Sequence, residues 1–126
     1  MSSIPEGLSY TAEHEWVRIE NEVATIGVTD YAQDALTDVV WVELPVIGDV
    51  VKSMEAFASV ESVKSVSEIY APLSGEVVEV NDNLETAPET INLDPYGEGW
   101  ICKIKLDTDD LSGLMNHEKY RELLGE

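Results

Sequence analysis

The pattern most informative about architecture lies in the segment Ala58-Ser-Val-Glu-Ser-Val-Lys64-Ser-Val-Ser-Glu-Ile-Tyr-Ala-Pro72-Leu-Ser-Gly75. Over residues 54–60, side chains expected to face the core alternate with side chains expected to face outward, which is the period-two pattern of a half-buried strand. A second strand is predicted from about Val66, and the turn between the two strands contains Glu61, Ser62, Val63 and Ser65. Because this turn is largely polar, we expect a hairpin with Lys64 at its tip, outside the core and within reach of another protein.

Strand signals recur on both sides of this hairpin. They cover residues 15–19, 23–28, 39–44, 77–80 and 100–106. Within residues 39–44, alternation places Val40, Val42 and Leu44 on one face. The polar residues 20–22 predict a hairpin connection between the first two of these strands.

Helix signals are fewer and shorter. Thr29 and Asp30 are suited to cap a helix of about two turns. Residues 86–89 have the spacing of a capping box, with an early proline. A last helix is predicted after Asn116, with an apolar side formed by Tyr120, Leu123 and Leu124. We therefore predict an all-β fold with small helices, the last of which packs against the sheets.

A weak internal repeat flanks the hairpin. Gly48-Asp-Val-Val-Lys52 resembles Gly75-Glu-Val-Val-Glu79, and Lys64 lies between the two copies. Two similar β units around one exposed lysine suggest a pseudo-twofold arrangement of hairpins, although such turns also arise easily in a Val-rich β protein. Since no long linker or low-complexity segment divides the 126 residues, we expect one domain.

The chain is strongly acidic, with a net charge of −19 at pH 7. Such a surface repels nucleic-acid phosphates and anionic membranes, so neither is expected as a partner. A basic protein surface is the natural counterpart, and the alternative is that the acidity serves only solubility. The first residues lack the features of a signal or transit peptide, and no apolar run approaches the roughly 18 residues of a membrane span. We therefore expect a cytoplasmic protein.

Residue types that commonly carry chemistry are few. The single cysteine, Cys102, falls on the apolar side of a predicted strand, so we expect a buried and unreactive thiol. His14 and His117 are the only histidines, and no Cys/His/acid cluster has metal-ligand spacing. The three tryptophans fall in strand patterns and are expected in the core. Neither a catalytic arrangement nor a metal site is predicted.

Several separated motifs resemble those of the glycine cleavage H proteins, a lipoyl-carrier family. The segment around Lys64 is similar to the lipoylation segment of that family. The other similar motifs, in chain order, are His14-Glu-Trp-Val17, Gly27-Val-Thr-Asp-Tyr-Ala-Gln-Asp34, Val42-Glu-Leu-Pro45 with Gly48-Asp49, and Pro95-Tyr-Gly-Glu-Gly-Trp-Ile101. Their common order and their spread over most of the chain make the resemblance specific.

The resemblance implies a lipoyl/biotinyl-type flattened barrel-sandwich of two antiparallel sheets, with the lipoyl lysine at a hairpin tip and a C-terminal helix. One lipoyl-carrier domain would span residues 1–126. Its lipoyl-like core would cover about residues 40–106, to which N-terminal strands and the last helix are added.

The resemblance also implies that lipoic acid is joined to Lys64 as an amide, with Glu61, Ser62, Val63 and Ser65 forming the attachment turn. The arm would accept the aminomethyl group of glycine after decarboxylation by a pyridoxal-phosphate glycine decarboxylase. It would present this group to a tetrahydrofolate-dependent aminomethyltransferase, and dihydrolipoyl dehydrogenase would reoxidise it. A lipoylating enzyme is the fourth implied partner, and the chain itself would be a carrier rather than an enzyme.

Members of this family are understood to hold the resting arm in a surface cleft. Glu15 and Glu68 correspond to the neighbourhood of that cleft, where partly exposed carboxylates would pair with the ammonium of the loaded arm. The alternative is that both are ordinary solvated acids. Two positions depart from the family pattern. Ala35 concerns how the arm is held, and Thr37 concerns the geometry of one turn.

Other interpretations of the same lysine stay open. A biotin carrier typically places methionines on both sides of its lysine, whereas Val63 and Ser65 flank Lys64. A lipoyl domain of a 2-oxo acid dehydrogenase resembles residues 48–80 but leaves the motifs at both ends unexplained. An enzyme with Lys64 as a Schiff-base nucleophile needs a desolvated lysine, which a polar turn does not favour. A paralogue that relays lipoyl groups to other proteins is compatible with the resemblance.

Overall fold

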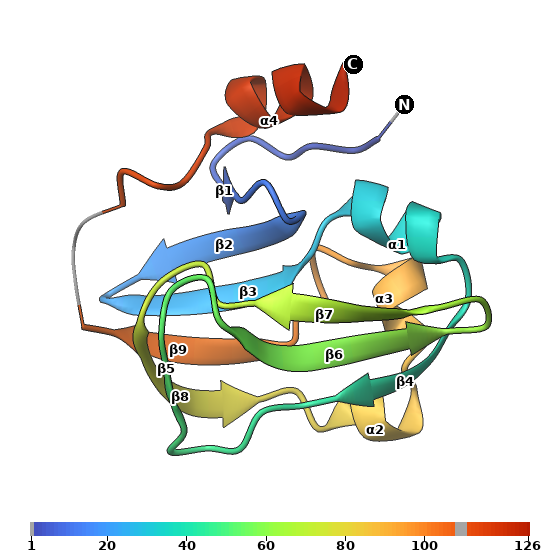
Figure 1. Ribbon diagram of the computed structural model, residues 1–126, viewed down its shortest axis with the longest axis horizontal. Helices are drawn as coiled ribbons and strands as arrows, with labels where there is room; N and C mark the ends of the chain where they lie inside the picture. The colour runs from blue at the N-terminus through green and yellow to red at the C-terminus, as the bar shows by residue number, and fades with distance from the viewer. Residues whose placement is uncertain (1, 108–110) are drawn as a thin grey trace.

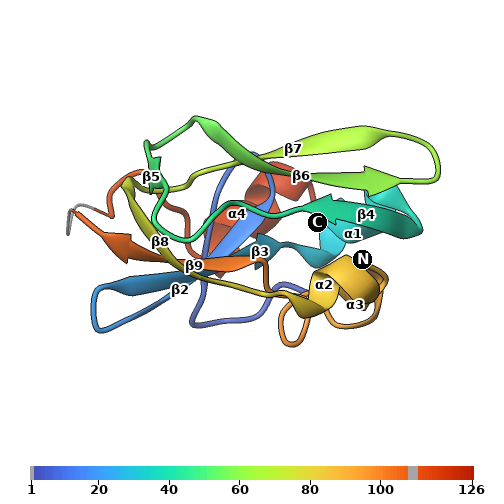
Figure 2. The same ribbon diagram turned by 90° about the horizontal axis from the view of Figure 1, so that it is seen from below.

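Two antiparallel sheets form the framework of the protein (Figure 1, Figure 2). The computed structural model describes residues 2–107 and 111–126. The larger sheet has the strand order β1 (Ser9–Tyr10), β2 (Glu15–Glu20), β3 (Val23–Val28), β9 (Cys102–Leu106), β8 (Gly75–Val80) and β5 (Val50–Val51). The smaller sheet has the order β4 (Val39–Glu43), β6 (Ala56–Ser62) and β7 (Val66–Tyr70). This architecture confirms the predicted all-β fold.

The core lies between the two sheets, which form two layers in Figure 2. Because successive side chains of a strand point to opposite faces, Ala58 and Val60 of β6 turn inward together with Ile69 of β7. The same cluster includes Ala24, Ile26, Val77 and Ile104 from the larger sheet. Fully burying one such aliphatic side chain stabilises the fold by about 1.5–3 kcal/mol. The smaller sheet, which contains the β6–β7 hairpin, is therefore firmly packed against the larger sheet.

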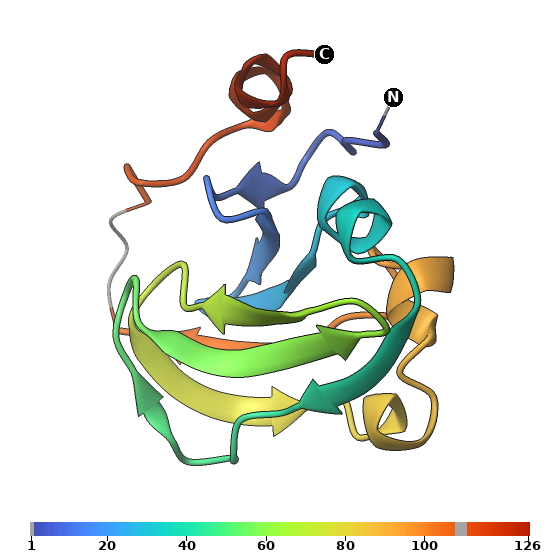
Figure 3. The same ribbon diagram turned by 45° about the vertical axis from the view of Figure 1, so that its right-hand side comes forward.

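A second cluster joins the two ends of the chain. Helix α4 (His117–Leu124) lies over the N-terminal segment in both Figure 1 and Figure 3. Its Tyr120 is fully buried and stacks on Tyr10 with ring centroids 4.7 Å apart. Asn116 caps the helix as predicted. Leu123 is 50% exposed, so the prediction that it belongs to the packed side is wrong.

Some strand positions differ from the prediction because of local irregularities. The register between β4 and β6 shifts between Val39 and Trp41. Since an extra residue reverses the alternation, Val40 is 47% exposed instead of sharing a face with the buried Val42. Trp41 is 53% exposed, contrary to its expected place in the core. Met54 has a φ of 73° and precedes β6 rather than belonging to it.

Three short helices connect the strands: α1 (Asp30–Leu36), α2 (Asn83–Thr86) and α3 (Thr90–Leu93). Thr29 caps α1 as predicted, because its side chain accepts the N–H of Ala32. Thr37 ends α1 with a φ of 64°, a conformation that glycine adopts more easily. Thr86 ends α2 instead of starting a helix, which corrects the predicted capping box.

The two glycine–acid repeats pair with each other. Val50 of β5 lies opposite Glu76 of β8, and Val51 lies opposite Gly75. This antiparallel pairing fits the predicted twofold relationship between the repeats.

The remaining sequence features concern reactivity and environment. Cys102 is fully buried as predicted, and burial raises the pKa of its thiol to about 12. In the described residues, no helix is long and apolar enough to cross a membrane. The same residues bring no three His, Cys, Asp or Glu side chains together in a way that could hold a metal ion.

Candidate functional site

Lys64 lies at the tip of the β6–β7 hairpin, as the sequence predicted. The ladder between the two strands ends at the pair Glu61–Val66, so residues 62–65 form the connection. The tip is the outermost point on its side of the molecule in Figure 1 and Figure 2. The side chain of Lys64 is exposed. Another protein can therefore approach this lysine freely.

The backbone of the turn is held by Ser62. Its N–H donates to the carbonyl of Ser65 (2.8 Å), and its hydroxyl accepts the N–H groups of Lys64 (3.3 Å) and Ser65 (3.2 Å). Ser62 is only 5% exposed, so its hydroxyl, which accepts two of these bonds, is shielded from water. The N–H of Val63 donates to the carbonyl of Asp38 (3.0 Å), which ties the turn to the start of β4. Lys64 therefore stands on a rigid base.

A cleft of about 270 Å³ opens beside this turn. It lies between β7, the edge strand of the smaller sheet, and helix α1. The residues that line it are Glu13, His14, Val28, Tyr31, Ala32, Ala35, Leu36, Ser65, Val66, Ser67, Glu68 and Ile69. Ala35, one of the departures noted in the sequence, is thus part of the wall. A long, mostly apolar group attached to Lys64 would find an apolar wall within reach.

Two carboxylates are placed at this cleft. Glu68 lines it from β7, and its side chain is exposed. Glu13, in the turn between β1 and β2, lines it from the other side and is also exposed. Glu13 was not among the predicted cleft residues, although it directly precedes the His14-Glu15-Trp16 motif.

Glu15 is buried, so the expectation of a partly exposed carboxylate is wrong. It is 1% exposed, and it accepts hydrogen bonds from the hydroxyl of Thr11 (2.6 Å) and the N–H of Tyr70 (3.2 Å). Burial raises the pKa of Glu15 to about 7, and the two hydrogen bonds oppose this shift. Glu15 lines a neighbouring recess of about 270 Å³, which also contains Glu13.

The position of Glu15 follows from the packing of β2. Val17 belongs to the cluster between the sheets, whereas Trp16 belongs to the cluster beneath α4. Because both faces of the strand are covered at this point, Glu15 is buried together with its two neighbours.

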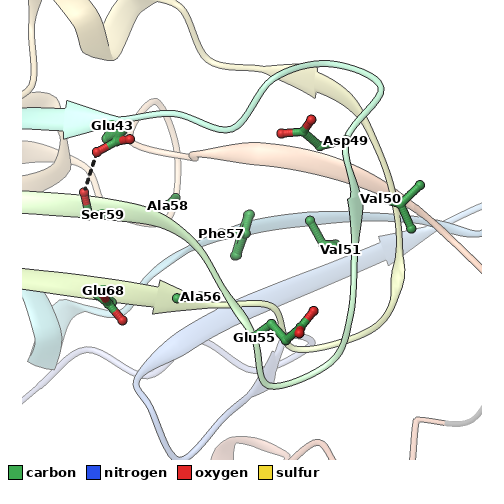
Figure 4. Close-up of a pocket in the computed structure, with 10 residues that line it drawn as sticks. All are labelled: Glu43, Asp49, Val50, Val51, Glu55, Ala56, Phe57, Ala58, Ser59 and Glu68. Atoms are coloured by element: carbon green, nitrogen blue, oxygen red, sulfur yellow. Dashed lines mark hydrogen bonds between the residues drawn. The ribbon is translucent and has the colours of Figure 1, made fainter.

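A wider groove of about 480 Å³ lies away from the turn, near the start of β6 (Figure 4). Its carboxylates come from Glu43, Asp49, Glu55 and Glu68. Phe57 and Val51 lie among them, and the hydroxyl of Ser59 contacts Glu43 at 3.5 Å. This groove has the charge to attract cations, but it is lined by residues 55–59 of the hairpin rather than by its tip. The cleft beside Ser65 is therefore the candidate site for a group attached to Lys64.

Comparisons with known proteins point to one family. The family model described as "Glycine cleavage H-protein" matches residues 8–126. The glycine cleavage system H protein of Staphylococcus carnosus is 50% identical over 125 residues, covering 98% of this chain and 99% of the relative. That of Rubrobacter xylanophilus is 51% identical over 126 residues, covering 100% and 98%.

A solved structure gives the same result for the fold. The crystal structure of a glycine cleavage system H protein from Mycobacterium marinum superposes with a TM-score of 0.92 at 38% sequence identity. The match covers 98% of this chain and 100% of that chain. Since sequence and fold agree over nearly the full length, this chain belongs to the glycine cleavage H-protein family.

Proposed function

We propose that this chain is the lipoyl-carrying shuttle of the glycine cleavage system, with lipoic acid attached through an amide to Lys64. The observation that carries this proposal is the position of Lys64, exposed at the tip of a hydrogen-bonded hairpin that borders a cleft. The names of the relatives support the glycine cleavage system as the setting.

The other lysines are placed less favourably. Lys103 and Lys105 lie within β9, and Lys119 lies in α4. Lys52 lies between β5 and β6 and is exposed. Among the lysines of the described residues, only Lys64 lies at the tip of a hairpin between two paired strands. Lys52 begins a turn between β5 and β6, which do not pair with each other, so it serves as the natural control.

The cleft fits a lipoyl arm by its chemistry. When bound, the lipoyl group supplies a disulfide that accepts the aminomethyl unit, while the protein binds and orients it. Leu36 and Ile69 provide buried apolar surface along the cleft and exclude water from it. Glu13 and Glu68 provide negative charge, which favours the ammonium of a loaded arm.

The proposal includes one domain and a set of partners. Strands β2 and β3 share one sheet with β8 and β9, which supports a single domain over residues 1–126 with its lipoyl-like core at about 40–106. The expected partners are the glycine decarboxylase, the aminomethyltransferase, dihydrolipoyl dehydrogenase and a lipoylating enzyme, all meeting the carrier in the cytoplasm. The chain itself presents the arm and performs none of their reactions.

Reconstitution tests the proposal. Lipoylated wild-type protein, Lys64→Arg and Lys52→Arg would each be added to the decarboxylase, and glycine-dependent CO₂ release measured. Arg keeps the charge but lacks the primary amine that forms the amide, so Lys64→Arg should be inactive while Lys52→Arg matches the wild type. Wild-type turnover by Lys64→Arg would refute the proposal.

A further inference from the structure

His14 occupies an unusual position at the edge of the cleft. It lies in the turn between β1 and β2 with a φ of 71°, a left-handed conformation that is uncommon outside glycine. Its ring contacts that of Tyr31 of α1, with centroids 4.7 Å apart. Strained backbone of this kind persists where the surroundings hold it, and it often marks a functional position.

A chain of hydrogen bonds connects His14 to α1 and α4. The N–H of Ala32 donates to the hydroxyl of Thr29 (3.2 Å), which lies 2.7 Å from the hydroxyl of Tyr120. The hydroxyl of Tyr120 in turn lies 2.9 Å from Nδ1 of His14. Tyr120 is 91 residues from Thr29 and 106 from His14, so the chain exists only in the folded protein.

The direction of these bonds follows from counting protons. Thr29 is fully buried, so its hydroxyl proton needs an acceptor, and the oxygen of Tyr120 is the acceptor beside it. The proton of Tyr120 is then free to be donated to Nδ1 of His14. With Nδ1 acting as an acceptor, neutral His14 carries its proton on Nε2. Burial lowers the pKa of His14, which favours this neutral form.

Nε2 is left facing solvent. Nε2 has no hydrogen-bond partner among the described residues. Since every buried side-chain nitrogen or oxygen atom of these residues has a partner, Nε2 is not a buried atom. Nε2 is therefore reachable by water, and His14 lines the cleft beside Ser65.

We propose that the Thr29–Tyr120–His14 chain holds His14 as the Nε2–H tautomer, and that this N–H donates a hydrogen bond to the resting arm. The inference rests on the proposed attachment of the arm to Lys64. The acceptor is either the amide oxygen of the arm or one of its sulfur atoms. An N–H donor does not bind an ammonium, so His14 orients the neutral part of the arm and leaves the cationic end to Glu13 and Glu68. His14 is thus a positioning residue.

The first test uses the protein without lipoate. Imidazole ¹⁵N NMR should show an unprotonated Nδ1 and a protonated Nε2 for His14. Tyr120→Phe removes the donor to Nδ1 and should give a mixture of tautomers. Tyr10→Phe is the matched control, because the Tyr10 hydroxyl donates to Pro5 instead and the ring only stacks on Tyr120. A protonated Nδ1 in the wild type would overturn the inference, whether or not Tyr120→Phe folds.

The second test adds the arm, with its attachment to Lys64 verified by mass. The Nε2–H resonance of His14 should shift on lipoylation, and octanoyl-loaded protein distinguishes the acceptor because it has the same amide without sulfur. A shift with both arms identifies the amide oxygen, and a shift with lipoate alone identifies sulfur. No shift in protein modified at Lys64 would overturn the inference but leave the proposed function intact. Failure of Lys64 to accept lipoate would instead refute the proposed function and, with it, the contact to the arm.

A variant pair measures the contribution of the contact. His14→Asn tolerates the left-handed backbone but is too short to reach the Nε2 position, so a phosphine should reduce the dithiolane roughly two- to tenfold faster. His14→Gln places an N–H near that position and should recover part of the protection. Equal reduction rates in the wild type and His14→Asn would contradict the proposed contact.

Discussion

The hydroxyl of Ser62 accepts the backbone N–H of Lys64 at 3.3 Å, so a buried side chain sets the conformation of the exposed lysine. The same hydroxyl accepts the N–H of Ser65, and the carbonyl of Ser65 accepts the N–H of Ser62. The turn at residues 62–65 is therefore fixed by hydrogen bonds of its backbone rather than by the side chain of Lys64. Changes at Ser62 should alter how the lysine is presented without removing it.

Ser62→Ala should slow lipoylation at Lys64 and lower the free energy of unfolding by about 1–3 kcal/mol. The loss follows because two N–H groups of the turn lose their acceptor in a shielded place. Chemical denaturation gives the stability, and mass-resolved time courses give the lipoylation rate. Ser59→Ala is the control, since Ser59 is on the same strand but its hydroxyl reaches only Glu43, at 3.5 Å. Equal lipoylation rates in the two variants would mean that Ser62 does not shape the turn.

Glu15 should make stability depend on pH in a definite direction. Its pKa is about 7 in the folded protein against an ordinary value of 4.5, so between these values the folded state holds a proton that the unfolded state has lost. The free energy of unfolding therefore falls as pH rises through this window and levels off above pH 7. The shift corresponds to ~3 kcal/mol.

Glu15→Gln isolates this contribution, because Gln keeps the shape and can bond to both Thr11 and Tyr70. Urea unfolding of both proteins from pH 5 to pH 8 should show the wild type losing stability relative to Glu15→Gln as pH rises. A difference that stays constant over this range would mean that Glu15 remains ionised in the folded protein.

Glu13 and Glu68 should prolong the lifetime of the aminomethyl-loaded arm. A partly exposed carboxylate–ammonium contact contributes about 0.2–1 kcal/mol, so changing both residues to Gln should speed decay of the isolated loaded protein about two- to thirtyfold. Glu22→Gln with Glu76→Gln is the matched control, since both side chains are exposed and neither lines the cleft. Equal decay rates in the two double variants would mean that Glu13 and Glu68 do not hold the loaded arm, and that apolar contacts and His14 do.

The hairpin and its lysine were predictable because their signals are local. Period-two alternation marks β6, and the polar turn separates it from β7, so residues 54–70 contain most of the information needed. The connection at residues 20–22 was predictable for the same reason, and Asn21 and Glu22 both adopt positive φ values there. Such residues form the two-residue hairpin turns whose twist matches that of paired strands.

The errors arose where packing depends on distant residues. Residues 39–42 are Val-Val-Trp-Val, so both faces of β4 are apolar in the sequence. The register shift that exposes Val40 and Trp41 therefore cannot be recognised from the hydrophobic pattern. Glu15 is buried because it shares the face of β2 that carries Val17 and packs toward the smaller sheet, where the N–H of Tyr70, 55 residues away, donates to its carboxylate. The contact from Tyr120 to His14 spans 106 residues, and no local pattern encodes it.

Association with the decarboxylase should weaken as salt increases. The net charge of −19 becomes one unit more negative when the Lys64 amine is converted to an amide, and the groove of Figure 4 concentrates four carboxylates near β6. Electrostatic steering raises association rates and is screened over a Debye length of ~8 Å at physiological ionic strength. Stopped-flow association rates should fall as salt rises through this range. A flat response would mean that the acidity serves solubility alone.

The measurement that tests the central claim most directly is intact mass followed by peptide mapping of protein incubated with lipoate and a lipoylating enzyme. The account predicts one added lipoyl group, located on the peptide that contains Lys64, and no added mass in Lys64→Arg. Lys52, exposed but outside the hairpin tip, should remain unmodified. A lipoyl group on Lys52, or biotin on Lys64, would contradict the account.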